Sequence, residues 1–265
     1  REVQAVPAIP PGVKMLLGGG TTARILHLVF QRWRYLGAER VVPNLVRWTR
    51  RCGFQCDLAV VISAGEVCER FEGEDTPALE FAWRRPYNGL ELWRIVRAIR
   101  RARYDILHFH VLGRREHLLR HMAAGNSRVI THLHGFPSEA AENRGVAQRW
   151  ARRAAAGSDL VLTNSAFVAN WYRALAPGGA PVRVLYNSLD LEQFRPSQSR
   201  AALRQLWGVA PETTVIGMVG RLIPEKGVAE GLLAIGPLLR SSERFRVVVL
   251  GDGPAAPGLR QWVRD

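Results

Sequence analysis

Strand-like and helix-like segments alternate along most of the chain, and this alternation restricts the possible folds more than any other feature. From Ala23 onward, short apolar runs are followed by longer segments in which apolar residues recur every three or four positions. Strands that alternate with helices in this way form a parallel sheet with helices on its faces. The sequence therefore predicts an α/β fold.

The N-terminal half is predicted to be a Rossmann-like domain over residues 23–186. Its predicted strands span 25–30, 55–62, 106–110, 129–132, 160–163 and 182–186, and its predicted helices span 38–51, 90–103, 146–156 and 165–175. Residues 1–22 contain three prolines and the run Gly18-Gly19-Gly20 without apolar periodicity. We expect this segment to be a flexible leader.

A second βα series begins after a polar stretch. Residues 187–200 are polar and include Pro196, which predicts an interdomain linker. Residues 201–207 are predicted to be helical, and the runs 215–219 and 247–250 are predicted strands. Because a doubly wound sheet needs more than two strands, residues 201–265 are expected to form an incomplete C-terminal domain.

Composition indicates a globular protein that favours anionic partners. There are 37 basic and 23 acidic residues, giving a formal charge of +14. The three cysteines Cys52, Cys56 and Cys68 cannot all pair, which fits a reducing compartment. We find no apolar run of about twenty residues. The expectation is a cytoplasmic protein, either soluble or peripheral on the inner face of the membrane.

The segment from Val219 to Gly227 has the chemistry of a diphosphate-binding loop. An apolar strand leads into Gly220, and Arg221 and Lys226 follow before the helical pattern that begins at Gly227. Arg offers a planar fork for phosphate oxygens, Lys offers a mobile charge, and the helix N-terminus adds N–H donors. A surface loop with two solvated cations is the alternative interpretation.

This segment and a second one resemble the nucleotide-sugar half of family 4-type glycosyltransferases. The first reads VGRL-x-PEKG, and the second, at Val247–Pro254, reads VV-x-LGDGP. Four more stretches fit the family pattern in the right order: Gly37-Ala38-Glu39-Arg40, Asp105–His110, Thr131–Gly135, and Asn187–Asp190 with Phe194. The resemblance covers the chain from about Arg24 to its last residue.

The resemblance implies a GT-B fold and a hexosyltransferase type of activity. Such an enzyme transfers a sugar from a nucleoside-diphosphate donor to a hydroxyl acceptor (lipid, polysaccharide or small molecule) with retention, and it needs no cofactor. Residues 23–186 would form the acceptor side and residues 201–265 the nucleotide-sugar side. The family's paired glutamates have no counterpart here, so the chain is expected to be truncated, binding nucleoside diphosphate weakly and transferring no sugar.

The resemblance also assigns roles to individual residues. His134 would contact the transferred sugar or its acceptor, and Gly220, Gly251 and Gly253 would line the nucleotide site. Gly37, between the first strand and the next helix, lets a backbone N–H approach an anion beside Arg221 and Lys226. The family commonly has two glycines there, whereas this chain has Leu36 before Gly37, and a helix cap without a ligand is the alternative.

Two His-x-His pairs suggest a second kind of site. His108 and His110 alternate along one predicted strand, as His132 and His134 do along another, so each pair should share a face. This pattern suggests a metal, but metal sites usually add a carboxylate or thiolate at close spacing. We therefore expect no metal, and we expect His110 to lie in the core or behind the site.

A basic amphipathic helix is predicted around residues 90–103. Leu92, Ile95, Val96 and Ile99 form its apolar side, and its cationic side consists of Arg94, Arg97, Arg100 and Arg101. One interpretation is a helix packed on the sheet with solvated arginines. The other is attachment to an anionic membrane surface, to which each cation contributes on the order of 1 kcal/mol.

Two other functions remain open from the sequence. A nucleotide-sugar epimerase or phosphorylase could use the same fold, because fold alone does not fix function. A basic nucleic-acid-binding module would account for the charge of +14. However, aromatic residues are not interleaved with the arginines, and the charge is spread along the chain, so we expect no specific nucleic-acid partner.

Overall fold

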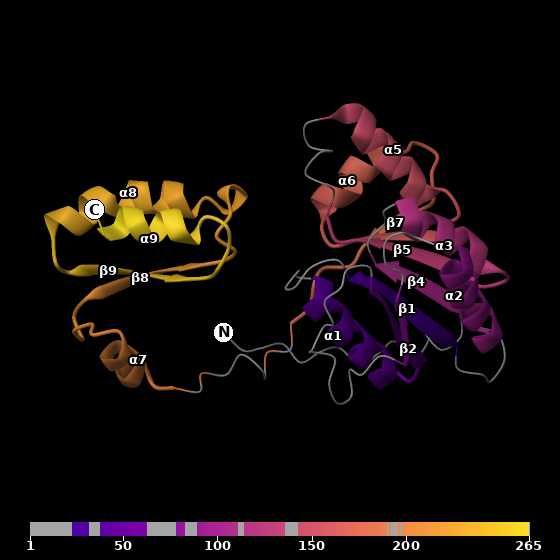
Figure 1. Ribbon diagram of the computed structural model, residues 1–265, viewed down its shortest axis with the longest axis horizontal. Coiled ribbons are helices and arrows are strands. Elements are labelled where there is room, and N and C mark those ends of the chain that lie inside the picture. Colours follow the sequence, from indigo (N-terminus) through magenta and orange to yellow (C-terminus); the bar gives the residue numbers. More distant parts are fainter. Residues whose placement is uncertain are drawn as a thin grey trace. The chain divides into compact units, whose positions relative to one another are not determined.

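The computed structural model describes residues 23–31, 38–62, 78–82, 89–110, 114–135, 143–189, 191, 196 and 198–264. The chain falls into two compact units, the first ending at Asp190 and the second beginning at Leu191. Each unit consists of parallel strands with helices packed on them (Figure 1). The α/β fold predicted from the alternating segments is confirmed.

The first unit is built on a seven-stranded sheet in which every neighbouring pair of strands is parallel. The strand order is β3-β2-β1-β4-β5-β6-β7. The strands are β1 (Arg24–Gln31), β2 (Gln55–Ile62), β3 (Leu79–Ala82), β4 (Ile106–His110), β5 (Arg128–Leu133), β6 (Leu160–Thr163) and β7 (Val182–Val184). The order reverses between β1 and β4, which is the position where open α/β sheets bind ligands.

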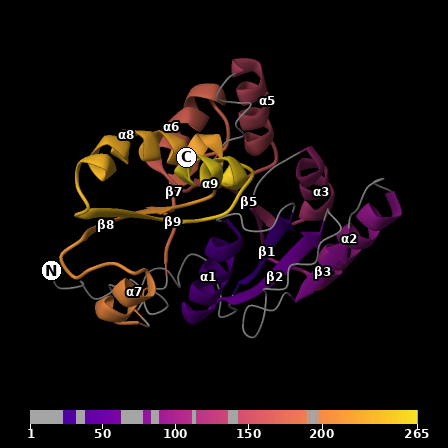
Figure 2. The ribbon, with the colours of Figure 1, turned by 60° about the vertical axis from the view of Figure 1, so that its left-hand side comes forward.

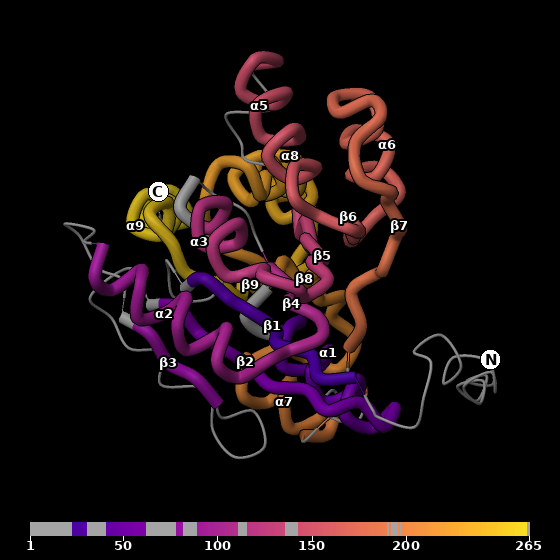
Figure 3. The backbone as a smooth tube through the Cα atoms, turned by 90° about the vertical axis from the view of Figure 1, so that its right-hand side faces the viewer, coloured from indigo at the N-terminus to yellow at the C-terminus, as the bar shows by residue number. Residues whose placement is uncertain are grey.

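Helices cover both faces of this sheet. They are α1 (Ala38–Arg51), α2 (Gly89–Ala102), α3 (Arg114–Ala124), α5 (Arg144–Ala155) and α6 (Ala166–Leu175). Leu28 packs in the cluster that contains the buried residues of α2, while its neighbour Val29 packs with Val42 of α1. Figures 1 and 3 accordingly show α1 and α2 on opposite faces of β1 and β2. The period-two alternation of strand side chains produces this two-sided core.

The helix ends follow from local sequence. The side chain of Asn143 accepts hydrogen bonds from the backbone N–H groups of Gly145 and Val146, and Ser165 caps α6 through Val168. Asn and Ser are preferred at this position because their oxygens satisfy N–H groups that have no partner within the helix.

One buried arginine caps the C-terminal end of α5. Arg120, fully buried on α3, donates to the carbonyl oxygens of Arg153 (2.7 Å), Ala154 (3.4 Å) and Ala156. It also donates to Thr131 Oγ1 at 2.8 Å. Burial lowers the pKa of Arg120 to about 10, so its guanidinium remains charged at neutral pH. Arg120 therefore links α3, β5 and the C-terminus of α5.

The second unit contains one pair of parallel strands, β8 (Thr214–Val219) and β9 (Phe245–Leu250). Its helices are α7 (Arg200–Leu206), α8 (Val228–Ser241) and α9 (Ala256–Arg264), and a short 3-10 turn spans Pro224–Lys226. Figures 1 and 2 show α8 and α9 on the same face of the strand pair. Its core is small and consists of Leu222, Val228, Leu232 and Ala256 with partly buried neighbours.

Most predicted elements are present with small differences at their ends. The bounds of β2, β4 and β6 coincide with the predicted strands. β7 is shorter than predicted, because it ends at Val184 and Tyr186 is 68% exposed. β3, α3 and α9 were not predicted. Among the helices that the structure describes, none has the length and apolarity needed to cross a bilayer.

Candidate functional site

The loop that follows β8 is the first candidate region. β8 ends at Val219, and the turn Pro224–Lys226 leads to Gly227, which caps α8 in the left-handed conformation (φ 65°, ψ 23°). A side chain with a Cβ is strained there, so glycine suits this position. The predicted strand-to-helix loop is therefore present.

Two exposed cations lie on this loop. Arg221 and Lys226 are both exposed, and neither has an ion-pair partner among the residues that the structure describes. Gly227 provides no side-chain cap for α8, so the first N–H groups of that helix are available to a ligand. Glu230 lies in the same first turn and offsets part of the positive charge. The loop combines the features of an anion-binding surface.

Gly251 and Gly253 lie where the loops after β8 and β9 meet. The N–H of Gly220 donates to the Leu250 carbonyl at 3.0 Å, and that of Leu222 donates to the Asp252 carbonyl at 2.9 Å. A Cβ at Gly251 would overlap the carbonyl oxygen of Gly220, and one at Gly253 would collide with the backbone of Leu222. Both glycines therefore allow close backbone contact between the two loops.

Five histidines gather in the first unit on the adjacent strands β1, β4 and β5 or directly after them. They are His27, His108, His110, His132 and His134. The ring centroids of His108 and His110 are 4.3 Å apart, and those of His132 and His134 are 4.2 Å apart. The prediction that each His-x-His pair shares one face is confirmed.

Hydrogen bonds connect three of these rings in series. His27 Nδ1 lies 2.9 Å from His110 Nε2, and His110 Nδ1 lies 3.0 Å from His134 Nε2. His110 is fully buried behind His134, as expected, and His134 is only partly buried. The carbonyl of His134 also accepts from Asn164 Nδ2 at 2.8 Å, which fixes the backbone at the end of β5.

Burial keeps these rings uncharged at neutral pH. It lowers the pKa of His134 to about 4, and it lowers the pKa of His132 to about 2 with a further effect from neighbouring His134 and His27. The pKa of His110 is also well below its ordinary value because the ring is buried. A neutral imidazole can donate one hydrogen bond and accept another, which suits a sugar hydroxyl.

The histidines lie at the point where the strand order reverses. β1 and β4 are neighbours, and His27 is paired in register with His108. The importance of His27 was missed in the sequence because its role depends on strand order, although a histidine inside an apolar strand was a signal. Gly37, predicted to approach the diphosphate, lies outside the residues that the structure describes.

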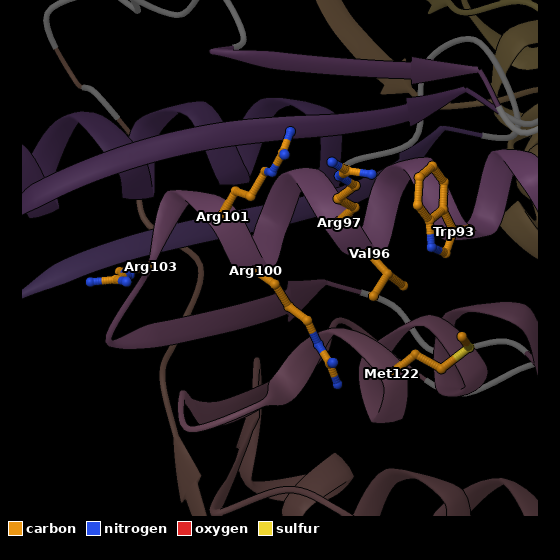
Figure 4. A pocket seen from close by; sticks show the side chains of 7 residues that line it. All are labelled: Trp93, Val96, Arg97, Arg100, Arg101, Arg103 and Met122. Atoms are coloured by element: carbon orange, nitrogen blue, oxygen red, sulfur yellow. The ribbon is translucent and has the colours of Figure 1, made fainter.

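The basic helix has the two sides that were predicted. Leu92, Ile95, Val96 and Ile99 are buried, and the four arginines are exposed. A surface pocket of about 610 Å³ adjoins the helix, lined by Trp93, Val96, Arg97, Arg100, Arg101, Arg103 and Met122. Figure 4 shows Arg100 extending toward the helix that carries Met122. Arg103 joins the predicted set in this pocket, whereas Arg94 does not line it.

The architecture is that of the GT-B fold, which solved structures of this class share. Over 91% of its length the chain superimposes with a TM-score of 0.70 on the crystal structure of Anabaena Alr3699/HepE in complex with UDP, at 21% sequence identity. It superimposes on the OtsA apo structure with a TM-score of 0.58 and 11% identity, over 92% of this chain and 68% of OtsA. At these identities the likeness shows the fold alone.

Sequence comparison identifies the family. The model for Glycosyltransferase Family 4 matches residues 35–193, and the chain belongs to this family of enzymes. It is 29% identical over 143 residues to a GDP-mannose-dependent alpha-(1-6)-phosphatidylinositol monomannoside mannosyltransferase of Mycobacterium tuberculosis, covering 54% of this chain. It is 39% identical over 83 residues, 30% of this chain, to a D-inositol 3-phosphate glycosyltransferase of Saccharomonospora viridis.

These matches cover only part of each known protein. The matched region is 37% of the mannosyltransferase and 19% of the inositol phosphate glycosyltransferase, and it is 65% of Alr3699/HepE. The resemblance predicted from six sequence stretches is confirmed at the level of family and fold, and the matched residues 35–193 contain the four stretches from Gly37 to Asp190.

Proposed function

We propose that the complete protein transfers a sugar from a nucleoside-diphosphate sugar to a hydroxyl acceptor with retention at the anomeric carbon. Residues 23–186 form the acceptor side and residues 201–265 the donor side, with 187–200 as the linker. The observation that carries this proposal is the pair of exposed cations, Arg221 and Lys226, beside the uncapped start of α8. An anionic diphosphate is the ligand that this arrangement favours.

The chemistry centres on the charge of the leaving group. As the bond between sugar and diphosphate breaks, negative charge grows on the phosphate oxygens. Arg221, Lys226 and the backbone N–H of Gly37 stabilise that charge more in the transition state than in the ground state. His134 orients the transferred sugar or the acceptor through its neutral imidazole, while Gly220, Gly251 and Gly253 shape the nucleotide site.

Relatives support a nucleotide-sugar donor but differ in its base. The Mycobacterium tuberculosis relative is named as GDP-mannose-dependent, whereas the Anabaena structure contains UDP. Membership of a glycosyltransferase family favours sugar transfer over the epimerase, phosphorylase and nucleic-acid-binding alternatives. A panel of nucleotides therefore tests donor choice directly.

Binding of nucleoside diphosphate to this chain tests the donor site. We expect UDP or GDP to bind saturably by isothermal titration calorimetry. Arg221→Ala or Lys226→Ala should each weaken binding by about 10-fold or more, since a hydrogen bond to a charged group contributes about 1.5–3 kcal/mol. Arg240→Ala is the matched control, because Arg240 is an exposed cation in the last turn of α8. Equal affinity in all four proteins would exclude this loop as the diphosphate site.

We also propose that α2 attaches the protein to an anionic membrane surface on the cytoplasmic side. The apolar residues of α2 are buried in the core, so they are not available to insert into a bilayer. What α2 offers to a membrane is Arg94, Arg97, Arg100 and Arg101 with the half-exposed ring of Trp93. The acceptor named for the Mycobacterium tuberculosis relative is a lipid, which fits this location.

Replacing these four arginines with Gln should release the protein from phosphatidylserine vesicles. Each cation near such a surface contributes on the order of 1 kcal/mol. We therefore expect partitioning of the protein onto the vesicles to fall by about 10²–10³-fold. Vesicle sedimentation measures it, and circular dichroism checks the fold. The matched control replaces four exposed arginines elsewhere in the first unit: Arg144, Arg149, Arg152 and Arg173. If the control variant lost as much vesicle binding, the effect would come from the net charge of the protein and not from α2.

A further inference from the structure

We propose that His110, His132 and His134 form a binding site for a Zn²⁺ ion at the carboxyl ends of β4 and β5. Each of the three residues offers one ring nitrogen, and these nitrogens all lie within 4.8 Å of one another. Two of the rings are buried and the third is partly buried. This site is additional to the diphosphate loop and goes beyond the proposed function.

The spacing of the nitrogens suits a tetrahedral ion. Zinc–nitrogen bonds of about 2.0–2.1 Å place the ligand nitrogens of a tetrahedral site roughly 3.3 Å apart. His110 Nδ1 and His134 Nε2 are 3.0 Å apart, so small rotations of the two rings would admit an ion between them. The three side chains come from paired, rigid strands, with His110 directly opposite His132 in the β4–β5 register.

His132 supplies the observation that points to a ligand. Its ring is 1% exposed, and neither of its nitrogens has a hydrogen-bond partner among the residues that the structure describes. A buried polar atom without a partner costs roughly 1–3 kcal/mol. Coordination of one nitrogen to a cation would remove part of that cost. It would therefore explain why an imidazole without a hydrogen-bond partner is buried at this position.

His27 has the position of an outer partner. Histidines that bind a metal usually pass their other N–H to an acceptor, which fixes the ring orientation. If His110 binds the ion through Nδ1, its Nε2 can donate to His27 Nδ1, which lies 2.9 Å away. The same series of rings that connects β1 to β5 would then orient the metal ligand.

Burial and access favour this triad over the neighbouring one. His27, His108 and His110 also lie close enough to hold an ion, but all three are buried. His134 is only partly buried, so the outer triad is the less enclosed of the two. His110 belongs to both triads, and one ion therefore occupies one of them.

Zinc is a cation that the ligand set suits. Imidazole nitrogens suit late first-row cations, and three histidines with an open fourth position are an established zinc arrangement. Our sequence-based expectation of no metal rested on the missing carboxylate or thiolate, which a three-imidazole site does not need. Where His134 serves the sugar, as proposed above, the ion and the sugar would compete for the same side chain.

Zinc binding by the purified chain tests this site without any assay of transfer. Titration against a chromophoric chelator should give one tight Zn²⁺ per chain, and X-ray absorption should find three imidazole nitrogens at about 2.0–2.1 Å. His132→Gln should weaken binding by about 100-fold or more, because changing even an outer partner of a ligand costs about 10–100-fold. Circular dichroism confirms that the variant is folded.

Two controls separate this site from other histidines. His108→Gln removes a ligand of the inner triad only. The double variant His117→Gln and His121→Gln removes a pair of rings on α3 whose centroids are 4.4 Å apart. Both proteins should bind Zn²⁺ as the unchanged chain does. The proposal is overturned if fewer than three imidazoles bind the ion, if no saturable binding occurs, or if either control abolishes binding while His132→Gln keeps it.

Discussion

Replacing Arg221 or Lys226 with Ala in the full-length enzyme is expected to lower the rate of sugar transfer by about 10²-fold or more. Removing one donor that stabilises developing negative charge costs about 10²–10³-fold in turnover in well-studied enzymes. Because the charge on the diphosphate grows as the bond to the sugar breaks, kcat should fall in addition to any change in KM. Steady-state kinetics with a nucleotide-sugar donor measures both constants.

The environment of the two cations supports a large effect. Both are exposed and have no ion-pair partner among the described residues, so their removal should not unfold the second unit. Arg240→Ala also removes one exposed cation, but from the last turn of α8, at the end far from the loop. This variant should leave kcat unchanged. Unchanged turnover in both loop variants would show that the diphosphate binds elsewhere.

Replacing Arg120 with Met is expected to destabilise the first unit by about 3–5 kcal/mol. Breaking a buried charged network by removing one partner costs this much, because the remaining polar groups stay buried without partners. Here the carbonyls of Arg153 and Ala156 at the end of α5 lose their donor, whereas Thr131 Oγ1 keeps its hydrogen bond with Ser158 Oγ. Urea denaturation followed by circular dichroism measures the free energy of unfolding.

An exposed ion pair in the same unit provides the control. Arg128 lies 2.7 Å from Asp159, and its side chain is 79% exposed. Arg128→Met should cost no more than about 1 kcal/mol, as is typical of surface pairs. If the two variants lost stability equally, Arg120 would be a solvated side chain in solution and our account of the end of α5 would be wrong.

The sequence predicted the fold where hydrophobic pattern and burial agree. β2, β4 and β6 are mainly apolar, largely buried strands of a parallel sheet, and their bounds coincide with the predicted ones. α3 was missed because its buried side includes Glu116 and Arg120, so no apolar stripe marks that helix. β3 was missed because it has only four residues, too few for a strand pattern to be recognised.

The candidate site was predictable where it depends on local sequence. The loop with Arg221 and Lys226 follows from a strand, a glycine and the start of a helix, all within one short segment. The histidine cluster depends on which strands become neighbours, and His27 joins it only because β1 lies beside β4. Alternation along one strand predicted that each His-x-His pair shares a face. It could not predict that β1, β4 and β5 are neighbours in the sheet.

An assay of sugar transfer tests the proposed activity. The full-length protein is incubated with UDP-linked and GDP-linked sugars and with inositol phosphate or lipid acceptors, and the product is examined by NMR. We predict release of nucleoside diphosphate together with a glycoside of the same anomeric configuration as the donor. Hydrolysis or epimerisation of the donor without formation of a glycoside, across the whole panel, would show that the protein is not a glycosyltransferase.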